Sequence, residues 1–424
     1  MDTNDKKTRR DSGHHGSFSW LWILLPLIVI LVVLQVSKAV KVHQSTLPKP
    51  VYPDRPIVKP DNPTVDVNQP LYLWQNEDGK YGYIDKTGKE VIPCQWESAS
   101  EFHEGLARVR KEEDGDAGFI NKKGEMAIPY QWYYASDFHD GMALVIREGE
   151  DNYGYIDDKG RLMIPCKWKY AHDFCEGMAC VADSEGNWGY YDKTGEMVIP
   201  CQWYDASDFH DGLARVQKEK NGKVSFINKR GDLVFECPWY VVFNFHDGRA
   251  RVQDRYSDDY GYIDKKGDLI IPFHWDSAND FQEGLARVRK DGKEGYIDKT
   301  GKLVIDYQWS LASDFHDGMA CVIADDAKIG FIDKTGELVI PYQWIRATDF
   351  NEGMACVVSI EDDESRSGFI DKTGELVIPC QWNVDDADNW FNINWDSYFH
   401  DGLAGVRGRD GHLHYIDKTG RIVK

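Results

Sequence analysis

The sequence lacks the short motifs that mark common catalytic and metal-binding sites. It contains no G-x-S-x-G, H-E-x-x-H or P-loop pattern, and its 9 cysteines form no C-x-x-C pair. Such motifs hold a nucleophile, a zinc-bound water or a phosphate at a fixed spacing, and C-x-x-C pairs bind zinc or exchange disulfides. We therefore expect no enzymatic activity and no cofactor, and we assign no catalytic, cofactor-binding or metal residue.

A surplus of basic residues is also missing. Lys and Arg number 50 against 71 Asp and Glu, which gives a formal net charge of −21. Nucleic-acid binding depends on a positively charged footprint, so we expect no nucleic-acid partner. With 42% hydrophobic residues, the chain is too apolar for wholesale disorder.

The first forty residues differ from the rest. Residues 1–19 are polar and predict a cytoplasmic tail, whereas Trp20–Val36 are almost wholly apolar. As a helix this run covers about 26 Å, the short end of a membrane span. We therefore predict that residues 20–40 are a transmembrane anchor, with the rest of the chain outside the cytoplasm at the cell membrane. The alternative is a signal peptide cleaved near Ser37-Lys38-Ala39, which gives a secreted protein.

A proline-rich segment follows the predicted anchor. Seven of the 16 prolines lie between residues 47 and 70. Proline fixes φ and has no backbone N–H, so this composition favours an extended, polyproline-like chain. Residues 41–70 are therefore predicted to be a linker.

Three landmarks recur through residues 71–424 with steps of mostly 34 to 36 residues. The first is the Gly of a Gly-Tyr-Ile-Asp phrase, at 82, 118, 154, 189, 261, 295, 330 and 368. The second is Phe-x-Asp/Glu-Gly, in which x is His in six of nine copies, ending at Gly105, 141, 177, 212, 248, 284, 318, 353 and 402. The third is Trp96, 132, 168, 203, 239, 275, 309, 344 and 382. Three landmarks in one register indicate a tandem repeat.

Each repeat is predicted to be a three-stranded β-meander of about 36 residues. Short alternating segments are separated by Asp-Gly and Lys-Thr-Gly turns, and no helical period is sustained after residue 70. About ten such units are present. Because the chain begins on a first strand near Leu71 and ends on a third strand at Ile422-Val423, no blade shared by the two termini is visible. We therefore predict an all-β, open superhelical array preceded by one transmembrane helix, with a closed β-propeller as the alternative.

The repeats resemble the bacterial WG-repeat family. The resemblance rests on aromatic-Gly pairs such as Trp188-Gly189 and on the phrases Tyr-Ile-Asp-x-x-Gly and Ile-Pro-x-x-Trp. Ser225 and His414 depart from it by replacing the Gly, and Glu236 and Asp306 by replacing the Pro. The resemblance implies a β-repeat module used for binding, and it implies no reaction and no catalytic residue.

The recurring side chains have two possible uses. The aligned Trp residues are expected to fill the core between repeats, with an exposed stripe for sugars or peptides as the alternative. The acidic residues before each Gly are expected to form turns, with a Ca²⁺-binding row as the alternative. Five cysteines share a repeat slot with Tyr and Phe, whereas Cys180, Cys321 and Cys356 share one with Arg or Leu. The interchange with Tyr and Phe favours packing, although neighbouring repeats allow a Cys166–Cys201 disulfide.

One insertion interrupts the pattern near the C-terminus. Trp344 and Gly353 are nine positions apart, whereas Trp382 and Gly402 are twenty apart. The inserted region carries the aromatic residues Trp390, Phe391, Trp395 and Tyr398. Aromatic residues on loops are typical of recognition surfaces, so these four are the candidate binding surface. A cap on the last repeat is the alternative.

The sequence thus favours a membrane-anchored, extracytoplasmic binding or scaffold protein. Long repeat surfaces suit recognition of a protein, a peptide or a cell-envelope glycan. The alternatives are a hydrolase that uses acidic residues on envelope glycans and a purely structural spacer.

Overall fold

The computed structural model describes residues 69–239, 241–361, 364–384, 398–409 and 412–424. The predicted cytoplasmic tail, the predicted transmembrane helix at residues 20–40 and nearly all of the linker lie outside these residues. Within them, every named element is a β-strand, and none of the described segments is a helix long and apolar enough to cross a membrane.

The Asp/Glu-Gly landmark forms a two-residue hairpin turn in each repeat. In the first copy Glu104 has φ 52° and Gly105 has φ 86°, and the backbones of His103 and Leu106 exchange hydrogen bonds of 2.9 and 3.0 Å. Positive φ at both central residues is the signature of a type I′ turn, whose twist matches a β-hairpin. The predicted turn role of these acidic residues is confirmed.

The Asp-Lys-Thr-Gly phrase forms a second kind of hairpin turn. The carboxylate of Asp298 accepts hydrogen bonds from the backbone N–H of Thr300 at 2.9 Å and of Lys302 at 3.1 Å, and Gly301 has φ 83°. Aspartate at the first position and glycine at the left-handed position are the residues that this turn requires. Both turns therefore follow from local sequence alone.

These hairpins build nine antiparallel sheets. The first three contain β1 (Tyr72–Gln75), β2 (Tyr81–Ile84), β3 (Glu90–Trp96); β4 (Ser98–Ala99), β5 (Leu106–Arg110), β6 (Ala117–Asn121), β7 (Met126–Trp132); and β8 (Tyr134–Ala135), β9 (Met142–Ile146), β10 (Tyr153–Asp157), β11 (Leu162–Trp168). The next three contain β12 (Tyr170–Ala171), β13 (Met178–Ala182), β14 (Trp188–Asp192), β15 (Met197–Trp203); β16 (Asp205–Ala206), β17 (Leu213–Gln217), β18 (Val224–Asn228), β19 (Leu233–Glu236); and β20 (Val241–His246), β21 (Arg249–Gln253), β22 (Tyr260–Ile263), β23 (Leu269–Trp275). The last three contain β24 (Ser277–Ala278), β25 (Leu285–Lys290), β26 (Lys293–Asp298), β27 (Leu303–Trp309); β28 (Leu311–Ala312), β29 (Met319–Ile323), β30 (Ile329–Asp333), β31 (Leu338–Trp344); and β32 (Arg346–Ala347), β33 (Met354–Glu361), β34 (Glu364–Asp371), β35 (Leu376–Asn383), β36 (Leu403–Arg407), β37 (Leu413–Asp417).

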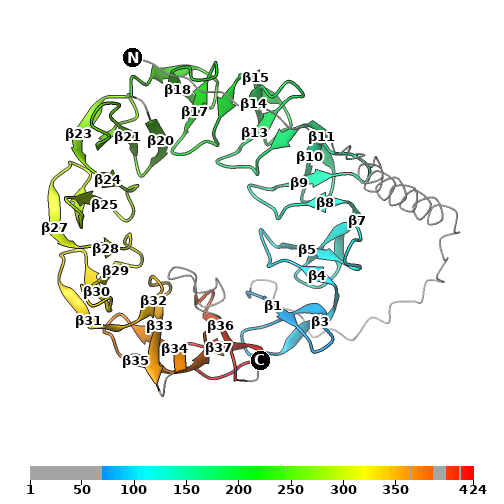
Figure 1. Ribbon diagram of the computed structural model, residues 1–424. Coiled ribbons are helices and arrows are strands. Elements are labelled where there is room, and N and C mark those ends of the chain that lie inside the picture. Colours follow the sequence, from blue (N-terminus) through cyan, green and yellow to red (C-terminus); the bar gives the residue numbers. More distant parts are fainter. Residues whose placement is uncertain (1–68, 240, 362–363, 385–397, 410–411) are drawn as a thin grey trace, which may run out of the picture. The chain divides into compact units, whose positions relative to one another are not determined.

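The prediction of three strands per repeat is wrong, because most sheets have a fourth. A two-residue strand such as β4 or β8 precedes the long strands and pairs with the first of them. In Figure 1 these short strands lie toward the inside of the ring, and third strands such as β27 and β31 lie toward its outside. The repeat therefore has the four-stranded form of a propeller blade.

The predicted open array is also wrong, since the sheets form a closed, nine-bladed β-propeller (Figure 1). The first and last sheets meet through side chains. The hydroxyl of Tyr72 donates to the backbone oxygen of Asp401 at 2.6 Å, and that of Tyr415 donates to the backbone oxygen of Leu73 at 2.8 Å. Closure needs no strand exchange, which is why the order of strands at the two ends of the repeat region gave no sign of it.

The core lies between neighbouring blades and contains the aligned tryptophans, as predicted. Trp203 and Trp239 are half-buried, and the other seven are buried. The indole N–H of Trp309 donates to the hydroxyl of Tyr342 in the next repeat at 2.7 Å. Where the next repeat has Cys in place of Tyr, as at Cys166 and Cys201, the cysteine packs in the same core. No disulfide is formed among the described residues, so Cys166 and Cys201 are not linked.

Candidate functional site

An aspartate from the Ala-Ser-Asp-Phe segment lies at most junctions between blades. At one junction Asp314, just after β28, accepts hydrogen bonds from Arg287 of the preceding blade at 3.1 Å and from Asn279 at 3.0 Å. Arg287 also binds the buried carboxylate of Glu294 at 2.8 Å. Arg251 pairs with Asp280 in the same way at another junction. An arginine of one blade thus neutralises the aspartate of the next.

The following junction lacks this arginine. Cys321 of β29 takes the place that Arg287 has in β25, and Asp349, just after β32, is the aspartate of the next blade. The carboxylate of Asp349 accepts a hydrogen bond from the Ser313 hydroxyl at 2.7 Å and lies 3.6 Å from Nε2 of His316. Because cysteine is much smaller than arginine, the replacement leaves both space and an acidic group beside it.

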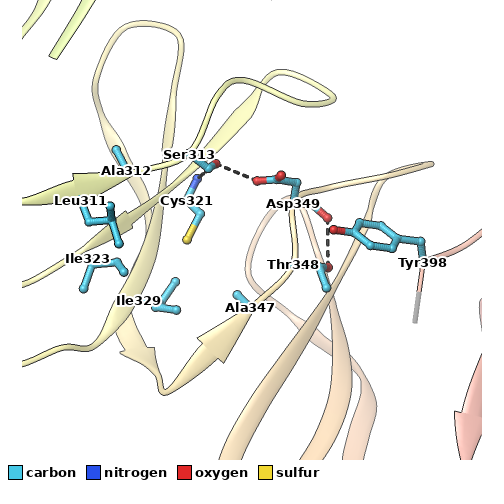
Figure 2. Close-up of a pocket in the computed structure, with 10 residues that line it drawn as sticks. All are labelled: Leu311, Ala312, Ser313, Cys321, Ile323, Ile329, Ala347, Thr348, Asp349 and Tyr398. Carbon is cyan, nitrogen blue, oxygen red and sulfur yellow. Dashed lines mark hydrogen bonds between the residues drawn. The ribbon is translucent and has the colours of Figure 1, made fainter. Parts of the chain in front are cut away.

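A pocket of about 280 Å³ occupies this junction (Figure 2). One side is apolar and the other carries hydroxyl groups and the Asp349 carboxylate. Burial raises the pKa of Asp349, and the hydrogen bond from Ser313 partly offsets this effect. The lining residues are Leu311, Ala312, Ser313, Cys321, Ile323, Ile329, Ala347, Thr348, Asp349 and Tyr398.

One residue of the predicted binding surface reaches this pocket. Tyr398 is half-buried, and its ring lies at the polar side of the pocket near Asp349 (Figure 2). Burial raises the pKa of its hydroxyl. The other three predicted residues, Trp390, Phe391 and Trp395, lie outside the described residues.

The acidic turn residues bind other parts of the ring. The carboxylate of Asp140 accepts a hydrogen bond from the backbone N–H of Gly177 in the next blade at 2.7 Å, and Lys193 of that same next blade binds it at 2.9 Å. Similar bonds join Glu283 to Gly318 and Lys334. The carboxylates that we considered as a Ca²⁺ row therefore connect successive blades.

The sequence did not identify Cys321 and Asp349 as site residues. The sequence predicts a packing role for Cys321 as for the other cysteines, and Asp349 is the aspartate that most repeats have before Phe in this segment. The signal in the sequence is the replacement of arginine by cysteine at position 321, because the same slot holds arginine at 108, 215, 251 and 287. At Cys321 the arginine is replaced while the aspartate of the next blade, Asp349, is retained, and this junction holds the pocket.

Comparison with known proteins identifies the repeat. The model of the WG containing repeat family matches nine segments that together cover more than half of the chain: residues 81–113, 118–149, 153–182, 188–223, 225–255, 260–293, 295–326, 329–359 and 368–384. The chain belongs to the WG containing repeat family. No curated protein sequence matches it.

Solved structures similar to this WG-repeat chain are remote. BamB from Moraxella catarrhalis is 10% identical, with a TM-score of 0.30 over 63% of this chain and 95% of that one. Virginiamycin B lyase from Staphylococcus aureus is 11% identical, with a TM-score of 0.25 over 65% and 95%. Hsv2 from Kluyveromyces lactis is 11% identical, with a TM-score of 0.30 over 70% and 95%. Likeness at this level carries no argument about function.

Proposed function

We propose that this WG-repeat propeller is a noncatalytic binding protein that recognises a protein or peptide through the pocket at Asp349. The observation that carries the proposal is the missing arginine. At the neighbouring junction Arg287 binds Asp314, whereas at this one Cys321 leaves the corresponding space beside Asp349 unfilled. A lysine or arginine side chain of a partner fits this space.

The pocket has the chemistry that such a side chain needs. The apolar surfaces of Leu311, Ile323 and Ile329 suit the methylene stem, and the Asp349 carboxylate suits the charged end. Residues 71–424 hold 41 basic and 65 acidic residues, so the ring as a whole attracts a basic partner. A partner side chain held this way uses the same contact that Arg108, Arg251 and Arg287 make with the aspartate of the next blade at three other junctions.

The test measures binding of short peptides to the full chain by fluorescence polarisation. The peptides differ at one position, which holds lysine, arginine, acetyl-lysine or norleucine. We expect lysine or arginine peptides to bind best, because only these place a positive charge on Asp349. Cys321→Arg introduces the residue that four other repeats have in this slot, so this variant should fold and lose binding. Asp349→Asn should weaken binding by about tenfold or more, as loss of a buried charge pair does.

Tyr256→Ala is the control, because Tyr256 is 92% exposed on a turn between β21 and β22. It should bind like the wild type. Equal binding by Cys321→Arg would contradict the proposal, and so would equal binding of the lysine and norleucine peptides. Binding of envelope oligosaccharides in place of peptides would instead support the glycan ligand that the sequence also allows, and hydrolysis of them would support the alternative of a hydrolase.

We further propose that the ring acts outside the cytoplasm at the cell membrane. The support is the apolar run Trp20–Val36, followed by a proline-rich segment that suits a spacer. Protease added to intact cells should remove the repeat region while cytoplasmic proteins survive. Protection of the repeats until the cells are lysed would contradict this placement, and recovery of the repeats from the medium would indicate secretion.

A further inference from the structure

Three side chains with different metal-binding atoms converge between two blades on another part of the ring. His172 follows β12, Cys180 lies in β13, and Asp208 follows β16 of the next blade. Their ligand atoms all lie within 4.8 Å of one another. Nδ1 of His172 is 3.0 Å from Oδ1 of Asp208. A nitrogen, a sulfur and an oxygen thus surround one point.

This trio departs from the commonest repeat pattern at two positions. Most other repeats have serine or asparagine in place of His172, and four have arginine in place of Cys180. At the junction of the Asp349 pocket, the corresponding places hold Ser313 and Cys321. The other junctions with a cysteine or arginine in this strand likewise have a different residue in the place of His172. In the described part of the chain, an imidazole joins a thiol and a carboxylate in this way only at His172. The cluster is therefore a local feature and not a property of the scaffold.

We propose that His172, Cys180 and Asp208 bind a divalent transition metal ion of the zinc type. Zinc takes thiolate, imidazole and carboxylate ligands, and three protein ligands leave a fourth position for water. The Cys180 side chain is buried, whereas those of His172 and Asp208 are 41% and 31% exposed. An ion bound by the buried Cys180 sulfur and by the two partly exposed ligands therefore keeps one side open to solvent.

The surroundings hold the ligands in place. The backbone N–H of His172 donates to the backbone oxygen of Cys180 at 3.0 Å, and the hydroxyl of Tyr155 donates to the backbone oxygen of His172 at 2.6 Å. The ring of Trp188 lies 5.1 Å from the His172 ring. Because two ligands share a hydrogen-bonded strand pair, only small side-chain movements are needed to receive an ion.

Metal binding at this site must displace protons. The hydrogen bond to Asp208 raises the pKa of His172, and burial raises the pKa of Cys180. Both groups must lose a proton to become ligands, so affinity should rise with pH. The site could not be predicted from the sequence, because His172 and Cys180 lie eight residues apart and Asp208 comes from the next repeat.

The test is titration of the full chain with Co²⁺, followed by visible and near-ultraviolet absorption, and with Zn²⁺, followed by calorimetry. Co²⁺ should show tetrahedral d–d bands and a sulfur-to-cobalt charge-transfer band. Cys180→Ser should remove the charge-transfer band, and His172→Ser should lower Zn²⁺ affinity by about tenfold or more. His172→Ser introduces the residue that most repeats have, so it should fold, which thermal unfolding without metal checks.

Cys321→Ser is the matched control, because Cys321 has the same slot beside a serine in place of a histidine. It should leave the Co²⁺ spectrum and the Zn²⁺ affinity unchanged. A charge-transfer band that persists in Cys180→Ser would overturn the proposal. So would an equal loss of Zn²⁺ affinity in Cys180→Ser and Cys321→Ser.

Discussion

The indole N–H of each aligned tryptophan depends on one residue of the next repeat. Trp309 donates to the hydroxyl of Tyr342, and Trp275 donates to that of Tyr307 at 2.6 Å. Among the described residues, the buried indole N–H of Trp168 has no hydrogen-bond partner, and the next repeat places Cys201 there. A buried donor without a partner costs about 1–3 kcal/mol. The blades are therefore joined with unequal strength.

Cys201→Tyr should stabilise the protein. The hydroxyl should accept the hydrogen bond from Trp168, which is worth about 1 kcal/mol. Chemical denaturation should show the gain as a higher free energy of unfolding. Cys201→Phe is the matched control, because it adds the ring without the hydroxyl. If the Phe variant is as stable as the Tyr variant, the unpaired N–H is not the cause.

Asp349 should make stability depend on pH with an unusual sign. Burial raises the pKa of this carboxyl above its ordinary value of 3.8. Between the two values the folded state holds a proton that the unfolded state has released, so stability should fall as pH rises through this range. Asp349→Asn should abolish that part of the pH dependence. Urea unfolding of both proteins across acidic pH measures it, and parallel curves would contradict the raised pKa.

At the scale of strands, the glycine of the aromatic-Gly pair permits a β-bulge where the second long strand of a blade pairs with the third. Tyr296 pairs with Ile305 and Glu294 pairs with Trp309, so two steps along β26 correspond to four along β27. A Cβ on Gly295 would lie 2.6 Å from the Ile305 backbone oxygen. One repeat has Ser225 in place of this glycine. In that repeat the pairing of β18 with β19 is regular at Ser225, so there is no bulge for a side chain to meet. Glycine is required only where the third strand bulges toward it.

Gly295→Ala should therefore destabilise the propeller by about 1–3 kcal/mol, as overpacking against backbone does. Thermal or chemical unfolding measures the loss. Ser225→Ala is the matched control at the same place in a repeat without the bulge, and it should change stability little. Equal effects of the two variants would show that the bulge does not determine the need for glycine.

The elements that could be predicted from the sequence are those that residues close together in the chain determine. The hairpin at His103–Leu106 and the turn at Asp298 depend on residues a few positions apart, and the tryptophan core follows from the period. The two-residue strand β4 has no pattern of its own, since it forms only against β5. The pocket at Asp349 was missed because it requires knowing which side chain of one blade faces the next.

At the scale of the whole ring, closure rests on contacts between residues that are far apart in sequence. Tyr72, Ile84 and Leu403 form a buried cluster between the first and last sheets. Neighbouring blades elsewhere are also joined by the chain, whereas the described residues of these two blades are joined by side-chain packing and hydrogen bonds. The closing junction is therefore the place where the ring can open without breaking a blade.

Leu403→Ala tests this directly. Removing a buried leucine side chain costs about 2–5 kcal/mol, and here the loss falls on the junction that only side chains hold. Small-angle scattering should show a larger radius of gyration while the blades keep their β-sheet signal. Leu213→Ala is the matched control, because Leu213 is buried at the same place between two blades that the chain connects. It should lower the melting temperature without expanding the ring. Equal dimensions for the two variants would mean that the closing junction is no weaker than the others, and that a propeller of this size is held shut by all its blades together.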